Sequence, residues 1–349
     1  GTQGSAGSDS LSADAFDEAC PAGIDQILMV RLARRLKEAP LKMKGQGNSP
    51  VIQAQKPAAT AAADQFFEDI NVFLRAYGDT IPRQSLLPML ESCLALAMTN
   101  IFLSTLNLLL IWSNERHVRP PKQQTPWPLF VDASNGADAF LRRYSEQCVD
   151  DIIDRLPRFA EINLALRIAR QWAQEEGCAV PDPIKDPLEH LNFLGSLFDS
   201  ETEKGYDLER DSRRRCNRLA DALKEDRPEI IATLQSQETH PTWRLAESIV
   251  LLMGPVNQFQ QFRRCLDSCM MTDQVNGLMS RRKGSVRGRT QERRSTVLTN
   301  TVLDFLVHRH LRSAARGTNK KTLTFGGLLA ILRDDYGIFI DEAPPGMSI

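Results

Sequence analysis

A run of basic residues near the carboxyl end is the part of this sequence best suited to chemistry. Seven cations fall within fourteen residues, opposed only by Glu292: Arg281, Arg282, Lys283, Arg287, Arg289, Arg293 and Arg294. Arginine presents a planar fork of donors that grips phosphate oxygens in pairs. Gly284 and Gly288 are expected to make the run flexible. We therefore predict an exposed, mobile segment that binds nucleic-acid phosphates without reading their sequence.

Charge is unevenly distributed along the chain. The 349 residues include 43 Lys and Arg and 44 Asp and Glu, for a net charge of −1. Residues 281–349 hold 13 Lys and Arg and 6 Asp and Glu, a net of +7, so the first 280 residues have a net of −8. Two alternatives to nucleic acid therefore stay open for the basic run. It could bind an acidic protein surface, as a latch onto the protein's own acidic body would, or form a solvated loop.

Two helices and a short strand are predicted after the basic run. Ser295 or Thr296 can cap the first helix, which runs to about Arg316, and the second extends from Phe325 to about Asp335. One face of the first helix is apolar at one end and cationic at the other: Leu298, Val302, Phe305, Arg309, Arg312 and Arg316. Residues 317–321 are predicted to form a basic turn, and residues 338–340 a strand.

This order of helix, basic turn, helix and strand is similar to the core of a winged-helix or helix-turn-helix unit, over residues 295–341. The resemblance implies that the start of the second helix would face DNA, through Lys320, Lys321, Thr322 and Thr324. That helix holds Gly326-Gly327 and few groups suited to base edges, so phosphate contacts are expected rather than sequence readout. No complete wing precedes the end of the chain, and winged helices also bind proteins, so the resemblance alone leaves function open.

Signatures of catalysis are absent from the sequence. It has no phosphate-binding Gly-rich loop ending in Lys-Ser/Thr, no Gly-x-Ser-x-Gly elbow and no His-Glu-x-x-His helix. Asp150 and Asp154 share a helical face, which we interpret as a solvated surface because no second acidic cluster matches it. Cys265 and Cys269 also share a face, and we interpret them as packed thiols. We expect no catalytic residue, cofactor or metal; an enzyme of unfamiliar type is the most distant alternative.

The rest of the chain is predicted to be mainly α-helical, as a multi-helix bundle or array, with separate helices at about 136–155 and 158–176. Its 42% hydrophobic and 25% charged residues exclude wholesale disorder. The uncharged stretch 92–113 is long enough to cross a bilayer, but its amides and hydroxyls favour a helix buried among neighbours. We divide the chain into an N-terminal helix with a flexible linker (1–58), an acidic helical body (59–280), and the basic segment with its winged-helix-like unit (281–349). The Pro-Pro-Gly end is compatible with a piece of a longer protein.

These patterns predict a non-enzymatic, nucleic-acid-associated helical protein that is one component of a larger complex. The alternative is a helical scaffold or adaptor whose partners are proteins. Seven scattered cysteines favour a reducing compartment, so we expect the protein in the cytoplasm, with no membrane partner. Nothing in the sequence separates DNA from RNA as the partner.

Overall fold

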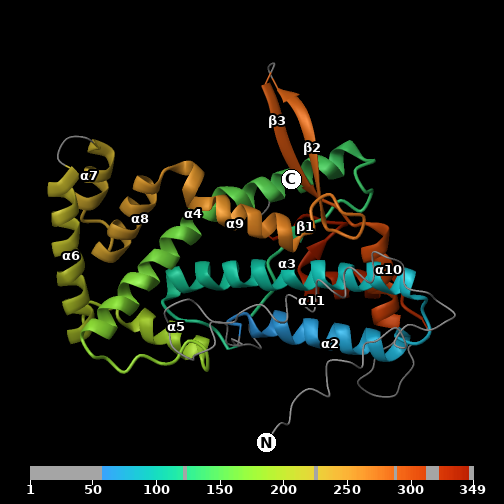
Figure 1. Ribbon diagram of the computed structural model, residues 1–349, viewed down its shortest axis with the longest axis horizontal. Coiled ribbons are helices and arrows are strands. Elements are labelled where there is room, and N and C mark those ends of the chain that lie inside the picture. The colour runs from blue at the N-terminus through green and yellow to red at the C-terminus, as the bar shows by residue number, and fades with distance from the viewer. Residues whose placement is uncertain (1–56, 121–123, 224–226, 287–288, 312–321, 346–349) are drawn as a thin grey trace, which may run out of the picture. The chain divides into compact units, whose positions relative to one another are not determined.

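The computed structural model describes residues 57–349, apart from 121–123, 224–226, 287–288, 312–321 and 346–349 (Figure 1). This part is mainly helical, as the sequence predicts, and the expected N-terminal helix lies outside it. The helices are α2 (Thr60–Tyr77), α3 (Arg83–Glu115), α4 (Ala139–Glu175), α5 (Pro187–Ser196), α6 (Glu203–Leu223), α7 (Pro228–Gln235), α8 (Pro241–Met253), α9 (Pro255–Cys269), α10 (Asn300–Leu311) and α11 (Phe325–Tyr336). The strands are β1 (Leu129–Phe130), β2 (Met279–Val286), β3 (Arg289–Thr296) and β4 (Ile338–Phe339).

Helix α3 is central to the core. It packs against α2, α4, α9 and α10, and Figure 1 shows it between α9 and α2. It is long and apolar enough to cross a membrane. However, 56% of its most apolar 18-residue stretch is buried inside the protein. Two of its amides find backbone acceptors. Asn100 Nδ2 donates to Asp335 O at 3.2 Å, and Asn107 Nδ2 donates to Thr125 O at 3.5 Å. These hydrogen bonds agree with the predicted buried helix.

Helix α4 is continuous, whereas the sequence predicts two helices, 136–155 and 158–176, on either side of Pro157; that prediction is wrong. A proline inside a helix costs about 3 kcal/mol, because it removes a donor and crowds the preceding turn. Leu156, Phe159 and Ile162 are fully buried on the same face, and each contributes about 1.5–3 kcal/mol when it leaves water. Burial therefore outweighs the cost of the proline.

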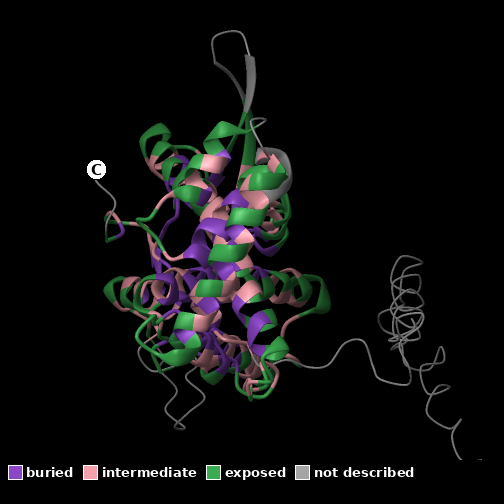
Figure 2. Ribbon diagram, turned by 90° about the vertical axis from the view of Figure 1, so that its left-hand side faces the viewer, coloured by how far each residue is buried: buried purple, intermediate pink, exposed green. Residues whose placement is uncertain are grey.

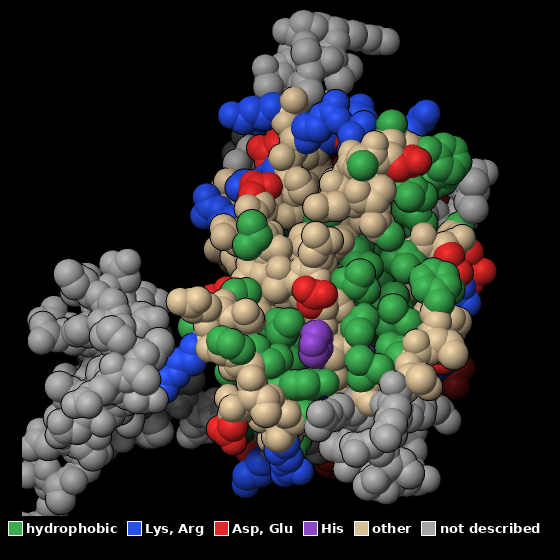
Figure 3. All heavy atoms as spheres, turned by 90° about the vertical axis from the view of Figure 1, so that its right-hand side faces the viewer, with side chains coloured by type: hydrophobic (Ala, Val, Ile, Leu, Met, Phe, Trp, Pro, Cys, Tyr) green, Lys and Arg blue, Asp and Glu red, His purple; other side chains and the backbone are tan. Residues whose placement is uncertain are grey.

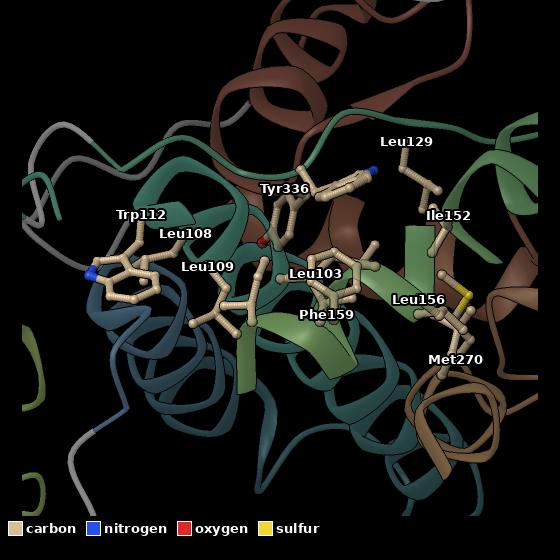
Figure 4. Packing of buried hydrophobic residues seen from close by; sticks show 14 of the residues in the cluster. Leu103, Leu108, Leu109, Trp112, Leu129, Ile152, Leu156, Phe159, Met270 and Tyr336 are labelled. Carbon is tan, nitrogen blue, oxygen red and sulfur yellow. The ribbon is translucent and has the colours of Figure 1, made fainter. Parts of the chain in front are cut away.

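One main hydrophobic core joins elements from both ends of the described chain (Figures 2 and 4). Figure 4 shows Trp112 of α3, Phe159 of α4 and Tyr336 of α11 within it. Residues 55–349 form one compact unit. The division into residues 1–58, 59–280 and 281–349 stays a prediction.

The winged-helix detail is not supported by the arrangement of the C-terminal elements. Strand β4 pairs in parallel with β1, through Leu129↔Ile338 and Phe130↔Phe339, and takes no part in a wing. The β2–β3 hairpin comes before α10 in the chain. Helix α10 packs on α3 and α2, while α11 packs on α2 and β4.

A buried polar network joins α2, α10 and α11. Arg309 Nε donates to Asp69 Oδ1 at 2.8 Å, and Tyr336 Oη donates to Asp69 Oδ2 at 2.7 Å. Arg309 Nη2 also pairs with Glu68 at 3.1 Å. Burial raises the pKa of Asp69 more than Tyr336 and Arg309 lower it. The Asp69 carboxylate therefore depends on all of its partners, since an uncompensated charge there would be costly.

We expect Arg309→Ala to lower the free energy of unfolding by about 3–5 kcal/mol, because it leaves Asp69 buried and unpaired. Urea titration monitored by circular dichroism measures this change. The matched control is Arg333→Ala, which breaks the exposed pair with Asp341 and should cost about 1 kcal/mol or less. Equal destabilisation of the two variants would contradict the role assigned to the network.

The start of α8 predicts a dependence of stability on pH. His240 caps this helix by accepting a hydrogen bond from Thr242 N at Nδ1, over 3.3 Å, so its imidazole must be neutral. Burial, together with Arg116, lowers the pKa of His240 to about 4 against the opposing effect of Glu209. Since the unfolded histidine titrates near pH 6.5, the cap is fully stabilising above that pH and is lost as the pH falls toward 4.

We therefore expect wild-type protein to become less stable between about pH 7 and pH 5 more steeply than His240→Asn. Asparagine caps a helix without titrating in this range. The urea midpoint at each pH measures the slope. Parallel slopes in the two proteins would show that His240 does not titrate with unfolding.

Candidate nucleic-acid interface

The predicted basic run forms an antiparallel hairpin rather than a mobile loop. In β2 and β3, Arg281 lies opposite Arg294, Arg282 opposite Arg293, and Lys283 opposite Glu292. Residues 287–288, which join the strands, lie outside the described residues. The sequence pattern missed these strands because alternation of apolar and polar residues appears only where one face of a strand is buried. A signal that could have indicated a hairpin is the presence of two segments of strand length, Met279–Val286 and Arg289–Thr296, separated by the dipeptide Arg287-Gly288.

The base of the hairpin is anchored in the core. Met279 and Thr296 are both buried, at 1% and 0% exposure. Thr296 Oγ1 donates to Phe130 O, and Val297 N donates to Leu278 O at 2.9 Å. Strand β3 also packs against α4. The hairpin therefore leaves the helical body in a fixed direction.

Arg294 belongs to this anchor. Its side chain is 6% exposed, and its Nε and Nη2 reach the two carboxylate oxygens of Asp267 at 2.8 and 3.0 Å. Its Nη2 also lies 3.0 Å from Glu292 Oε1. A bidentate pair of this kind fixes both distance and orientation. Arg294 is thus occupied and has little surface to offer a ligand.

Arg281 and Arg293 are half exposed, and each is paired with a carboxylate of the body. Arg281 Nε lies 2.6 Å from Asp273 Oδ2, and the hydrogen bond to Asp273 raises the pKa of Arg281. Arg293 Nη1 lies 3.1 Å from Glu146 Oε2 on α4. These two ion pairs are what the latch alternative predicts, and they hold the lower hairpin against the acidic body.

Among the hairpin side chains that the structure describes, Arg282 and Lys283 are the cations left for a ligand. Both side chains are exposed, and no ion pair with another described residue is found for either. Figure 3 shows Lys and Arg side chains gathered at the base of the hairpin, with acidic side chains just below them. We call Arg282, Lys283 and Arg293 the hairpin cations; Arg293 differs from the other two because it must exchange Glu146 for a phosphate on binding.

The other predicted phosphate-binding residues do not join this surface in the described part of the chain. Arg309 is buried in the Asp69 network. Thr324 lies at the start of α11, where its hydroxyl oxygen caps the helix by accepting from Gly327 N at 3.1 Å. The remaining cations lie in segments, or have side chains, outside the described residues: Arg287, Arg289, Arg312, Arg316, Lys320 and Lys321.

The acidic and thiol candidates show no assembled catalytic or metal centre among the described residues. No group of three or more His, Cys, Asp or Glu could hold a metal there. Asp150 and Asp154 are exposed on α4. Partial burial of the Asp150 carboxyl and repulsion from Asp154 raise the pKa of Asp150, and the positive charge of Arg293 lowers it by less. Burial raises the pKa of Cys269 to about 12, and its Sγ lies 3.9 Å from that of Cys265. Such a thiol stays protonated and poorly nucleophilic.

We expect Arg294→Ala to lower the free energy of unfolding by about 2–3 kcal/mol, since it removes several charge-assisted hydrogen bonds at a buried position. Arg282→Ala removes the same charge from an exposed position and should change stability by less than about 0.5 kcal/mol. Urea midpoints of both variants test this. An Arg294→Ala variant as stable as wild type would mean that the anchor lies elsewhere.

Comparison with known proteins identifies a family but no solved relative. No curated protein and no solved structure matches the chain. The family model described as Methylation-associated defense system protein MAD7 matches residues 11–348. Because this match spans almost the whole sequence, the chain belongs to the family of Methylation-associated defense system protein MAD7.

Proposed function

We propose that this protein is a non-enzymatic component of a methylation-associated defense system that binds nucleic-acid phosphates, in the cytoplasm, through its hairpin cations. The observation that supports this most strongly is the pairing pattern of the hairpin. Arg294 and Arg281 are bound to carboxylates of the body, while Arg282 and Lys283 remain exposed and unpaired among the described residues. Exposed cations on a fixed support neutralise phosphates and release condensed counterions.

The fixed support also favours binding. A flexible loop gives up conformational freedom when it is ordered on a ligand, and that entropy cost opposes association. Here the strand ladder from Met279↔Thr296 to Val286↔Arg289 is already formed. The cost of ordering this backbone therefore falls on folding and not on binding.

The alternative function, a scaffold that binds other proteins, is supported by exposed apolar side chains on α3. Leu87, Leu94 and Met98 are 53%, 37% and 45% exposed on α3, and their spacing places them along one side of the helix. Exposed apolar stripes of this kind are typical of protein interfaces.

The decisive test is binding of the purified chain to labelled duplex and single-stranded oligonucleotides across a salt series. We expect wild-type protein to bind, with log affinity falling linearly against log salt. Arg282→Ala/Lys283→Ala/Arg293→Ala should weaken binding about equally for all sequences. The salt slope should shrink by roughly one for each phosphate that the variant no longer neutralises.

The matched control is Arg75→Ala/Lys185→Ala/Arg218→Ala, which removes three exposed cations from elsewhere on the molecule. It should keep the wild-type salt slope. Equal weakening by both triple variants would mean that net charge, and not the hairpin, drives binding. If wild-type protein binds neither oligonucleotide at about 50 mM salt, where phosphate contacts are strongest, the proposal is wrong and the scaffold function takes its place.

A further inference from the structure

We infer that the nucleic acid bound beside the hairpin is single-stranded, and that one of its bases stacks on Phe140 at the start of α4. This inference rests on the proposed function, because it names the kind of nucleic acid that the same surface takes. It is drawn from an exposed aromatic ring, the residues that hold this ring in place, and the cations that lie beside it.

Phe140 presents its ring to solvent in the first turn of α4. The residue is 63% exposed, although phenylalanine is among the residues most often buried. The backbone of this turn is fixed by Asp138, whose Oδ1 accepts from Phe140 N at 2.7 Å and from Leu141 N at 3.0 Å. An exposed ring on a fixed backbone can stack on the face of a nucleic-acid base.

Other aromatic residues hold the Phe140 ring in position. The rings of Phe140 and Tyr144 meet edge to face with centroids 4.6 Å apart, and Tyr144 lies 5.9 Å from the buried ring of Phe130. Phe130 O in turn accepts the hydrogen bond of Thr296 Oγ1 at the base of the hairpin. A chain of contacts therefore links the hairpin anchor to Phe140. Because the ring is positioned before a ligand arrives, little conformational entropy is lost when a base stacks on it.

Cations continue from this ring toward the hairpin. Phe140, Arg143 and Glu146 follow one another at intervals of three residues on α4, so each is a neighbour of the next on the helix surface. Arg143 is exposed, with no ion pair to another described residue. Glu146 lies 3.1 Å from Arg293, which belongs to β3, and β3 packs against α4 (Figure 1). A strand whose phosphates follow Arg293 and Arg143 therefore brings a base to Phe140.

This combination of groups favours a single strand over a duplex. The bases of a duplex are already paired and stacked on one another, so a protein must unstack them to reach a face. The faces of a single strand are open. Proteins that bind single strands combine cations along the backbone with aromatic rings under the bases, and α4 and β3 together carry both kinds of group.

Replacing the ring without changing the charge tests the inference. We measure binding of labelled oligothymidylate and oligouridylate by fluorescence anisotropy across a salt series, which also separates DNA from RNA. We expect Phe140→Ala to weaken binding by about tenfold with an unchanged salt slope, because it removes a stack and no phosphate contact. Phe140→Trp should restore wild-type affinity, since tryptophan also offers an aromatic face. Arg143→Ala should instead reduce the salt slope by roughly one.

The matched control is Phe67→Ala, which removes a ring that is 71% exposed on α2. This variant should bind both oligonucleotides as wild type does. Equal weakening by Phe67→Ala and Phe140→Ala would overturn the inference. So would a Phe140→Ala variant whose affinity for duplex DNA falls as much as its affinity for single strands, because the ring would then act as a wedge between base pairs.

The two proposals fail in different ways. If the chain binds no nucleic acid at low salt, the proposed function itself is wrong. If it binds single strands and Phe140→Ala binds them as tightly as wild type, the proposed function stands and the stacking site is wrong.

Discussion

The bidentate pair between Arg294 and Asp267 fixes the base of the β2–β3 hairpin, and the position of each hairpin cation depends on it. Both guanidinium hydrogen bonds are 3.0 Å or shorter, and the arginine is almost fully buried. The neighbouring hydrogen bond of Thr296 with Phe130 continues this anchor into the core. A charged pair held this way specifies direction as well as stability. The exposed residues Arg282 and Lys283 are therefore carried by strands whose base is fixed to the helical body.

Arginine has three different roles along this one segment of the chain. Arg294 and Arg309 are buried and paired, and they stabilise the fold. Arg281 is half exposed but bound to Asp273, whereas Arg282 is exposed with no such partner among the described residues. Only cations that can reach phosphate release counterions on binding. The net charge of +7 over residues 281–349 therefore overstates the surface that a nucleic acid could use.

Much of the helical fold can be predicted from local sequence, because the residues that begin a helix, end it and form its apolar face lie close together in the chain. Gly78 follows the last residue of α2, Asp186 caps α5 and Pro255 begins α9, and each is a residue type that is common at its position. The continuity of α4 through Pro157 could not be predicted, because it depends on burial against other helices. The hairpin escaped prediction for the opposite reason: both of its faces are largely polar in sequence, so no periodic apolar signal exists.

The candidate site could be located from the sequence, but the roles of its residues could not be separated. A run of cations can be counted, but the partner of each one is set by tertiary structure. Arg309 and Asp69 lie 240 positions apart, and nothing in the sequence links them. The same holds for Arg293 and Glu146, which are 147 positions apart. The charge pattern therefore points to the segment that forms the β2–β3 hairpin, but it does not divide the cations of that segment into anchors and exposed groups.

The central claim is that a preformed hairpin, and not the apolar side of α3, is the surface that meets the partner. Hydrogen–deuterium exchange of the full chain, with and without a short single-stranded oligonucleotide, tests this most directly. The account predicts that the oligonucleotide slows exchange in residues 281–286 and 289–293 and leaves residues 87–98 of α3 unchanged. Unchanged exchange in the hairpin, or protection confined to α3, would contradict it.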